Sequence, residues 1–442
     1  MISIEEKRKI WLRRFEEERE LLFGRVANDI EKHRKGDARI LVVDEKGAPV
    51  SNKRVKITQK THDFGFGAHI FLLDELETPE RNAEYRELFA KYFNLATVPF
   101  YWSDLEPEEG KPRFEKDSPK IYRRPAPDLC VEYCEERGIR PKLHCLVYDK
   151  FTPDWLPKGD MSGMEEAYEK HIAEIAERYR GRLCEFEVIN ETLYSHEWTT
   201  ASVICDRADM VEWAFGLSRR YLPGETLVIN EGQSQIPDLA ERRHFARYFM
   251  QIERAIAKGA QIDKIGLQHH IFTGCTARTP DEYDVALQNP TYVDPRQTLS
   301  ALDTLARIGL PLEITEMTVP TFGDTPEDEE LQADLLEYIY TVLFSHPALD
   351  SIVYWNSVEG YCYDAGPQAN WNENRCRGAL FRRDLSPKPS AERLYKLINE
   401  TWHTELEATT DAEGYVTVRG FFGDYELECE GGSIRFGIHK DK

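Results

Sequence analysis

The sequence predicts an α/β fold: a (β/α)8 TIM barrel with a small β-rich module built from the N- and C-terminal segments. Eight β-rich runs alternate with longer helical stretches through the middle of the chain, which is typical of parallel βα units. Both ends of the chain instead carry short alternating runs separated by turn residues. The length of 442 residues also suits either about three domains or one large barrel with extras.

The two ends of the chain are expected to form one module. Residues 3–34 place apolar side chains at helical spacing among charged ones, which predicts a single amphipathic helix. Two β-rich runs follow, 39–43 and 54–58, and the turn residues between them predict a hairpin. Because an isolated hairpin is marginal in water, we expect it to pair with the C-terminal strands. The predicted units are helix 1–36, hairpin 37–62, barrel 63–402 and C-terminal strands 403–442.

The barrel strands determine where functional residues should lie. In chain order, the candidates are residues 64–71, 94–101, 140–148, 184–190, 226–230, 264–271, 311–317 and 351–355. Active sites of such barrels lie at the C-terminal ends of the strands, so chemistry is expected there.

Composition excludes several classes of function. The 57 basic and 79 acidic residues give a formal charge of −22, which repels nucleic acid and anionic lipid. No apolar run reaches the roughly 20 residues that a bilayer requires. The first residues carry scattered charges and lack the apolar core of a secretory signal, and the nine cysteines are irregularly spaced. We therefore expect a cytoplasmic protein with free thiols and no nucleic-acid or membrane partner, and composition leaves the oligomeric state open.

Two carboxylates follow apolar strands and are the candidate catalytic pair. Glu191 comes after the fourth strand, within VINETL, and Glu316 lies in EITEM on the seventh. Two carboxylates at one barrel mouth suit acid–base or nucleophilic work, and glycoside hydrolysis needs such a pair. The alternative is that each glutamate merely caps a helix or pairs with a surface arginine.

The segments around these carboxylates resemble glycoside hydrolase family 10, the retaining β-1,4-xylanase family, over about residues 64–398. EFEVINETL is similar to the acid/base segment of that family and PLEITEM to its nucleophile strand. The resemblance implies that Glu191 is the general acid/base and Glu316 the nucleophile. It also implies a set of substrate-binding residues, namely His144, Asn190, Gln268, His270, Trp355, Trp102, Tyr101 and Asp149.

Some of these positions depart from the family pattern. The second-strand signature of the family carries an Asn and a Lys that hold the −1 and −2 sugars, where this chain has Val98 and Tyr101. Asp149 replaces the second histidine of the third-strand motif, which is expected to bring an extra carboxylate near the cleft. Catalysis is therefore predicted more firmly than action on xylan.

Two local patterns predict further details of the site. His269 and His270 are adjacent on a strand, so one should face the barrel mouth and the other the helical layer. The aromatic stretch 361–372 fits either a loop that stacks on sugar rings or a packed cover over the mouth.

The leading hypothesis is a retaining β-glycoside hydrolase that acts by double displacement on xylan-derived or related β-linked oligosaccharides. A second hypothesis keeps the mechanism but changes the substrate, to an exo-acting enzyme or one for plant glycoside conjugates. A third is a non-catalytic carbohydrate-binding barrel. The pattern predicts no cofactor and no metal ion.

Overall fold

The computed structural model describes residues 2–198, 200–366, 369–430 and 432–440. At its centre is a closed barrel of parallel strands in the order β10-β3-β4-β5-β6-β7-β8-β9, which confirms the predicted fold class. The barrel strands are β3 Gly65–His69, β4 Leu95–Pro99, β5 Arg140–Val147, β6 Glu185–Asn190, β7 Leu227–Glu231, β8 Lys264–His270, β9 Leu312–Thr318 and β10 Leu349–Tyr354.

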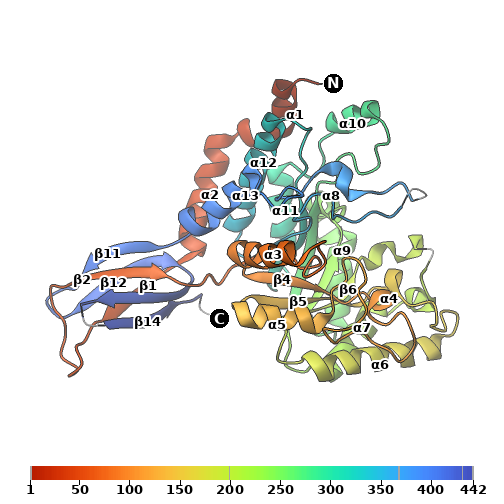
Figure 1. The fold of residues 1–442 in the computed structure, drawn as a ribbon, viewed down its shortest axis with the longest axis horizontal. Helices are drawn as coiled ribbons and strands as arrows, with labels where there is room; N and C mark the ends of the chain where they lie inside the picture. The colour runs from red at the N-terminus through yellow and green to blue at the C-terminus, as the bar shows by residue number, and fades with distance from the viewer. Residues whose placement is uncertain (1, 199, 367–368, 431, 441–442) are drawn as a thin grey trace.

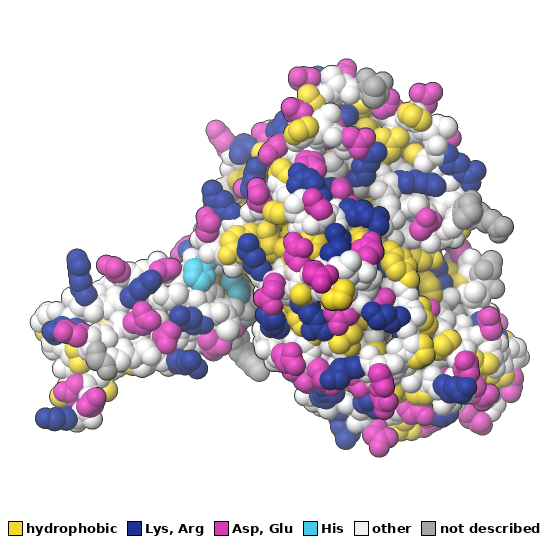
Figure 2. Space-filling view, viewed as in Figure 1, with side chains coloured by type: hydrophobic (Ala, Val, Ile, Leu, Met, Phe, Trp, Pro, Cys, Tyr) yellow, Lys and Arg dark blue, Asp and Glu magenta, His cyan; other side chains and the backbone are white. Residues whose placement is uncertain are grey.

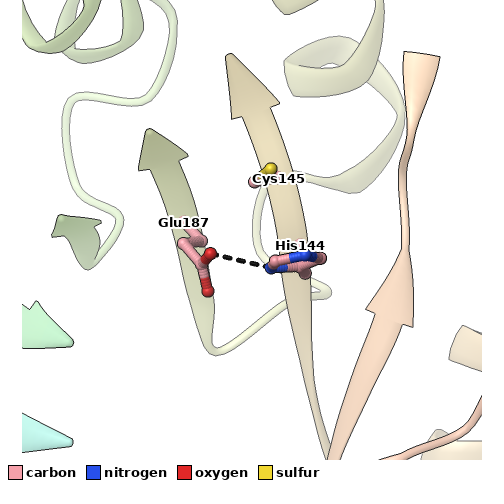
Figure 3. A group of neighbouring side chains, drawn as sticks. All are labelled: His144, Cys145 and Glu187. Carbon is pink, nitrogen blue, oxygen red and sulfur yellow. Dashed lines mark hydrogen bonds and ion pairs between the residues drawn. The ribbon is translucent and has the colours of Figure 1, made fainter. Parts of the chain in front are cut away.

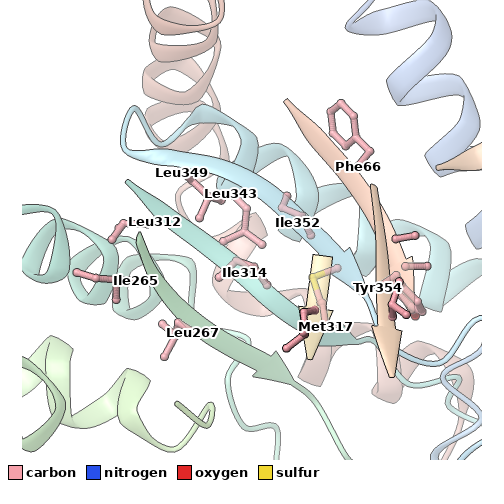
Figure 4. Packing of buried hydrophobic residues seen from close by; sticks show 14 of the residues in the cluster. Phe66, Ile265, Leu267, Leu312, Ile314, Met317, Leu343, Leu349, Ile352 and Tyr354 are labelled. Carbon is pink, nitrogen blue, oxygen red and sulfur yellow. The ribbon is translucent and has the colours of Figure 1, made fainter. Parts of the chain in front are cut away.

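Helices follow each strand and surround the barrel (Figure 1). They are α3 Pro79–Tyr92, α4 Trp102–Leu105, α5 Pro127–Arg137, α6 Met161–Tyr179, α7 Met210–Tyr221, α8 Gln235–Arg242, α9 Arg247–Ala257, α10 Pro280–Leu287, α11 Pro295–Ala306, α12 Pro326–Ser345 and α13 Pro389–Lys396. Apolar strand residues pack against them, as Figure 4 shows for Ile314 of β9, Ile352 of β10 and Leu343 of α12. Burying one such side chain stabilises the fold by about 1.5–3 kcal/mol.

The inside of the barrel contains charged side chains. Lys142 of β5 donates to Glu313 of β9 at 2.6 Å, and these strands lie on opposite sides of the closed barrel. Lys264 of β8 pairs with Glu185 and, at 2.8 Å, with Asp350. Burial disfavours the ammonium of Lys142, but the surrounding glutamates outweigh this effect and raise its pKa. The bottom of the barrel is thus an ionic layer that crosses the interior.

The N-terminal segment differs from the expected single helix. It forms α1 Ile4–Glu16 and α2 Arg19–His33, which are separated by two residues. Helical periodicity continues across this break, which explains why the sequence pattern reads as one helix. A capping box at Ser3 and Glu6 begins α1, and Trp11, Leu12 and Phe15 are the buried residues of that helix.

The expected hairpin within 37–62 is wrong, because its two strands join different sheets. β1 Lys35–Leu41 pairs with β12 Tyr415–Phe421, whereas β2 Arg54–Gln59 pairs with β11 Glu405–Thr409 and β13 Gly423–Cys429. β14 Gly432–Ile438 completes the second sheet beside β13. The two ends therefore do form one module, and Val42, Ile57 and Val418 contribute to its own apolar core.

The module is joined to the end of the barrel where the strands begin, on the side of β1 and β2 in Figure 1. Arg34, after α2, is buried and donates to the backbone carbonyls of Phe344, His346 and Leu349, which lead into β10. Three carbonyl groups are satisfied by one guanidinium, so Arg34 fixes the module to the barrel.

The surface carries charges of both signs, which are spread over the face seen in Figure 2. Among the described residues, no helix is both long and apolar enough to span a bilayer. All nine cysteines are free thiols, as expected from their spacing.

We predict that Lys142→Met lowers the free energy of unfolding by about 3–5 kcal/mol, because it leaves buried carboxylates without their counter-charge. Urea titration followed by tryptophan fluorescence measures the change. The double variant Lys142→Met/Glu313→Gln should recover part of the loss. The matched control is Lys111→Met, which breaks an exposed pair with Glu108 and should cost at most about 1 kcal/mol. Equal effects of the two single variants would show that the ionic layer is not structurally important.

Candidate active site

A cavity of about 520 Å³ opens at the C-terminal ends of the barrel strands. Eight of the ten residues predicted from the sequence line it, namely Glu191, Glu316, His144, Asn190, Gln268, His270, Trp355 and Tyr101. They come from six different strands or the loops that follow them, so the closed barrel is what brings them together.

Glu191 lies directly after β6 and has a left-handed backbone conformation, with φ of 53°. Its Oε2 accepts a hydrogen bond of 2.6 Å from the hydroxyl of Tyr148, and its Oε1 accepts one of 3.0 Å from the amide of Gln268. A non-glycine residue in this conformation is uncommon, and such strained residues recur at active sites. The two hydrogen bonds fix the direction of the carboxylate toward the cavity.

Glu316 of β9 is only 5 % exposed. Its Oε1 accepts from Gln268 at 3.1 Å, and its Oε2 lies 3.1 Å from Nε2 of His270. Burial, together with the nearby Glu187 and Glu191, raises the pKa of Glu316 well above its ordinary value, while His144 opposes the shift. Such a carboxylate is costly to ionise, which makes it reactive toward an electrophilic carbon when it is ionised.

Gln268 connects the two carboxylates through one amide nitrogen. This nitrogen lies 3.0 Å from Oε1 of Glu191 and 3.1 Å from Oε1 of Glu316. Two oxygens that share one donor can be no farther apart than about 6 Å, which is nearer to the separation of about 5–5.5 Å in retaining glycosidases than to that of about 6.5–9.5 Å in inverting ones.

His270 is held neutral beside Glu316. Burial lowers its pKa to about 4. The hydroxyl of Thr318 lies 3.0 Å from Nδ1, so it can donate there and leave the proton on Nε2 for Glu316. The neighbouring His269 instead lies near Thr298 of α11, which agrees with the expectation that the two rings face opposite sides.

His144 has both ring nitrogens occupied by protein groups. Nδ1 lies 2.7 Å from Glu187, as Figure 3 shows, and Nε2 lies 3.1 Å from the hydroxyl of Tyr101. Burial disfavours the charged ring, but Glu187 and Glu316 outweigh burial and raise the pKa of His144. The Tyr101 hydroxyl therefore occupies Nε2 of His144, and both side chains line the cavity.

Cys145 lies beside this pair and forms with it a set of three atoms at metal-binding spacing. Burial raises the pKa of the Cys145 thiol well above its usual value, so it does not supply a thiolate. The hydrogen bond between His144 and Glu187 already uses the other two donor atoms. These residues thus fit a histidine–carboxylate pair better than a metal centre.

Asn190 is oriented by Asn230 of β7. Its Oδ1 accepts from Nδ2 of Asn230 at 2.9 Å, which leaves its own amide NH2 for a ligand. Asn230 also donates to Glu187 at 3.2 Å and approaches Glu316 at 3.4 Å. One buried amide therefore aligns three side chains of the site.

Aromatic side chains form the walls of the cavity. Trp355 packs edge-on against Phe71, His144 and His270. Tyr363 and Trp371 from the stretch 361–372 also line the cavity, which favours the first of the two alternatives for that loop. Residues 367–368 of this stretch lie outside the described part of the chain.

Two predicted substrate-binding residues do not reach the cavity, and both expectations are corrected. Trp102 stacks on His171 of α6 and donates to Glu106 at 3.0 Å. Asp149 is fully buried and accepts from Tyr168 and Ser202, so it is a structural anchor and adds no charge to the cleft. The departure at Val98 also has no direct effect there, because this side chain is buried within the apolar core.

Several cavity residues were missed from the sequence. Tyr148, Arg123, Arg124 and Glu373 line the cavity, and Glu187 and Asn230 support it from below. The polar ends of β6 and β7, in EFEVIN and LVINE, were the available signal for the last two. The others lie in loops, where hydrophobic periodicity does not predict which way a side chain points.

Glu231 at the end of β7 holds the turn that follows Glu191. Its Oε1 accepts from the hydroxyl of Thr192 at 3.0 Å and from the backbone N–H of Leu193 at 2.8 Å. Complete burial raises the pKa of Glu231 to about 8. The carboxyl group is thus largely protonated at neutral pH, and it stabilises the turn as a neutral hydrogen-bond acceptor.

A (β/α)8 barrel with two neighbouring carboxylates at the C-terminal ends of its strands is an arrangement found in glycoside hydrolases. The model of glycosyl hydrolase family 10 matches residues 60–397. The chain therefore belongs to glycosyl hydrolase family 10, which confirms the resemblance seen in the sequence.

Relatives in this comparison are distant. The chain is 23 % identical over 400 residues to anti-sigma-I factor RsgI6 of Acetivibrio thermocellus, covering 90 % of this chain and 45 % of the relative. It is 24 % identical over 385 residues to endo-1,4-beta-xylanase 2 of Arabidopsis thaliana, covering 86 % and 31 %. The chain thus spans less than half the length of these two proteins.

Solved structures share the fold. Native xylanase 10B from Thermotoga maritima superposes with a TM-score of 0.59 at 19 % identity, covering 77 % of this chain and 96 % of that one. Xylanase 10B from Thermotoga petrophila RKU-1, in complex with xylobiose, has the same TM-score at 21 % identity and covers 77 % and 95 %.

We predict that Glu231→Gln gains stability relative to the wild type as the pH rises from 5 to 8. The folded-state pKa of Glu231 is raised from 4.5 to about 8, so wild-type stability is complete below pH 4.5 and is lost as the pH rises toward 8. The amide variant cannot ionise and escapes this loss. Melting temperatures at pH 5 and 8 measure the effect, with the exposed Glu45→Gln as control. A wild-type–variant difference that is the same at both pH values would contradict the raised pKa.

Proposed function

We propose that this protein is a retaining β-glycoside hydrolase that resembles endo-β-1,4-xylanases and acts on xylan-derived or related β-linked oligosaccharides. The observation that carries the proposal is the pair Glu191 and Glu316, which share the amide of Gln268 inside an aromatic-lined cavity. The names of the xylanases among its relatives support the same substrate class. A non-catalytic barrel would need neither carboxylate.

The reaction proceeds in two displacements. The carboxylate of Glu316 attacks the anomeric carbon, while Glu191 gives its proton to the departing glycosidic oxygen. The resulting ester between Glu316 and the sugar is then attacked by water, whose proton returns to Glu191. The anomeric configuration is retained because the carbon is inverted twice.

The surrounding residues support this cycle. Gln268 and His270 donate hydrogen bonds to Glu316 and stabilise its ionised form before attack. Tyr148 holds Glu191 in place for both proton transfers. The amide of Asn190 is available for the 2-hydroxyl of the sugar, whose hydrogen bonds strengthen in the transition state.

We also propose that the protein acts in the cytoplasm. Nine free thiols suit a reducing environment, which supports the cytoplasm. An enzyme there would act on short oligosaccharides after their import.

We predict that only one of the two carboxylate variants depends on the leaving group of the substrate. Glu316→Ala should lose several orders of magnitude in rate on every substrate, because the covalent step is lost. Glu191→Ala should lose far more on natural oligosaccharides than on dinitrophenyl glycosides, which need no acid. Added azide should rescue Glu191→Ala and yield a β-glycosyl azide, identified by NMR. Equal losses on both substrate types would remove the acid/base role from Glu191.

We also predict weak or no action on polymeric xylan. Tyr101 stands where xylanases carry a charged donor, so a xylose unit should bind roughly one to two orders of magnitude less tightly there. Short or substituted oligosaccharides and aryl β-glycosides should be cleaved better. Hydrolysis assays on xylan, xylobiose, xylotriose and aryl glycosides measure this preference, and a ladder of products from the polymer would contradict it.

A further inference from the structure

Arg123 is a buried cation in the cavity wall. It is 4 % exposed, lines the cavity, and donates from Nη1 to the backbone carbonyl of Tyr361. Its Nε has no hydrogen-bond partner, and no carboxylate in the described ranges forms an ion pair with it. A neutral carbonyl satisfies one of the five N–H groups but does not balance the charge.

An unpaired guanidinium is unexpected in this protein. Acidic residues outnumber basic ones by 79 to 57, so carboxylate partners are abundant. Because burying an uncompensated charge is costly, such a group needs a counter-charge, and no described carboxylate forms an ion pair with it. Its place in the cavity wall points to a ligand as the source of that counter-charge.

Arg124 places a second positive charge nearby. Its Nε donates to Asp104 at 2.9 Å, and its guanidinium lies 3.9 Å from the ring centroid of Tyr101. The guanidinium carbons of Arg123 and Arg124 both lie within 6 Å of the ring centroid of Phe71, at 5.9 and 5.5 Å. Asp104 pairs with Arg124, so Arg123 is the member of this pair that forms no ion pair within the described part of the chain.

We propose that Arg123 and Arg124 form a subsite for the carboxylate of a hexuronic acid attached to the oligosaccharide. A planar carboxylate matches the fork of a guanidinium, and Phe71 and Tyr101 supply apolar surface for a sugar ring. Tyr101 contacts Arg124 with its ring and His144 with its hydroxyl. The acidic sugar is therefore the neighbour or branch of the unit that Glu316 attacks. This inference rests on the proposed function and defines its substrate class.

The experiment compares a neutral xylo-oligosaccharide with the same chain carrying one glucuronosyl branch. Wild-type protein should cleave the acidic chain with a higher kcat/KM, and Arg123→Met should reduce the ratio of the two kcat/KM values, acidic over neutral, roughly 10- to 100-fold. Arg383→Met is the matched control, because Arg383 is exposed, pairs with Glu77 and does not line the cavity. Melting temperatures of the variants monitor folding.

A binding measurement shows whether the subsite proposal is wrong independently of whether the proposed enzymatic activity is wrong. Calorimetry with Glu316→Gln measures the affinity for both chains without turnover, and the acidic chain should bind more tightly only while Arg123 is present. Equal affinity for both chains, or a preference that survives Arg123→Met, would overturn the subsite. Absence of hydrolysis of either chain by the wild type would overturn the proposed function, and the binding comparison would still decide the subsite.

Discussion

The structure depends on an ion pair that crosses the inside of the barrel. Lys142 and Glu313 face each other from β5 and β9, and neither side chain is exposed. Barrel interiors of this type are usually filled by branched apolar residues. Here the lowest layer is ionic, and it also includes Glu185 and Lys264. Because charges in such a place cannot remain unpaired, the strands must keep the register that pairs them.

The proposed catalytic groups lie at the top of this polar interior. Above the ionic layer, Glu187 lies 3.8 Å from Lys142 and binds His144, while Thr315 donates to Asn230 at 2.6 Å. Asn230 then reaches Asn190 at the level of the carboxylate pair. Each catalytic side chain is thus held from beneath by a buried partner, which holds it in position with little rearrangement during a reaction.

The sequence predicts the barrel and the catalytic pair because both depend on short-range patterns. Apolar runs mark the strands, and Glu191 and Glu316 follow directly from two of them. The register shifts in β6 and β8, near Glu187 and Gln268, are not visible in those patterns, although they change which side chains face inward. Asp149 and Trp102 were misplaced for a related reason: they stand next to motif residues in the chain, but their partners Tyr168, Ser202 and His171 are distant in sequence.

The two ends of the barrel have different roles: one attaches the β-rich module and the other carries the cavity. Arg34 and the β-rich module occupy the end where the strands begin, and the cavity opens where they finish. The module has its own apolar core, and none of its described residues lines the cavity. Selectivity for a substrate must therefore come from the loops after the strands, where Tyr101, Arg123 and Arg124 lie close together in the chain. A loop can exchange such residues without disturbing the ionic layer below, so the catalytic pair can persist while the recognised sugar changes.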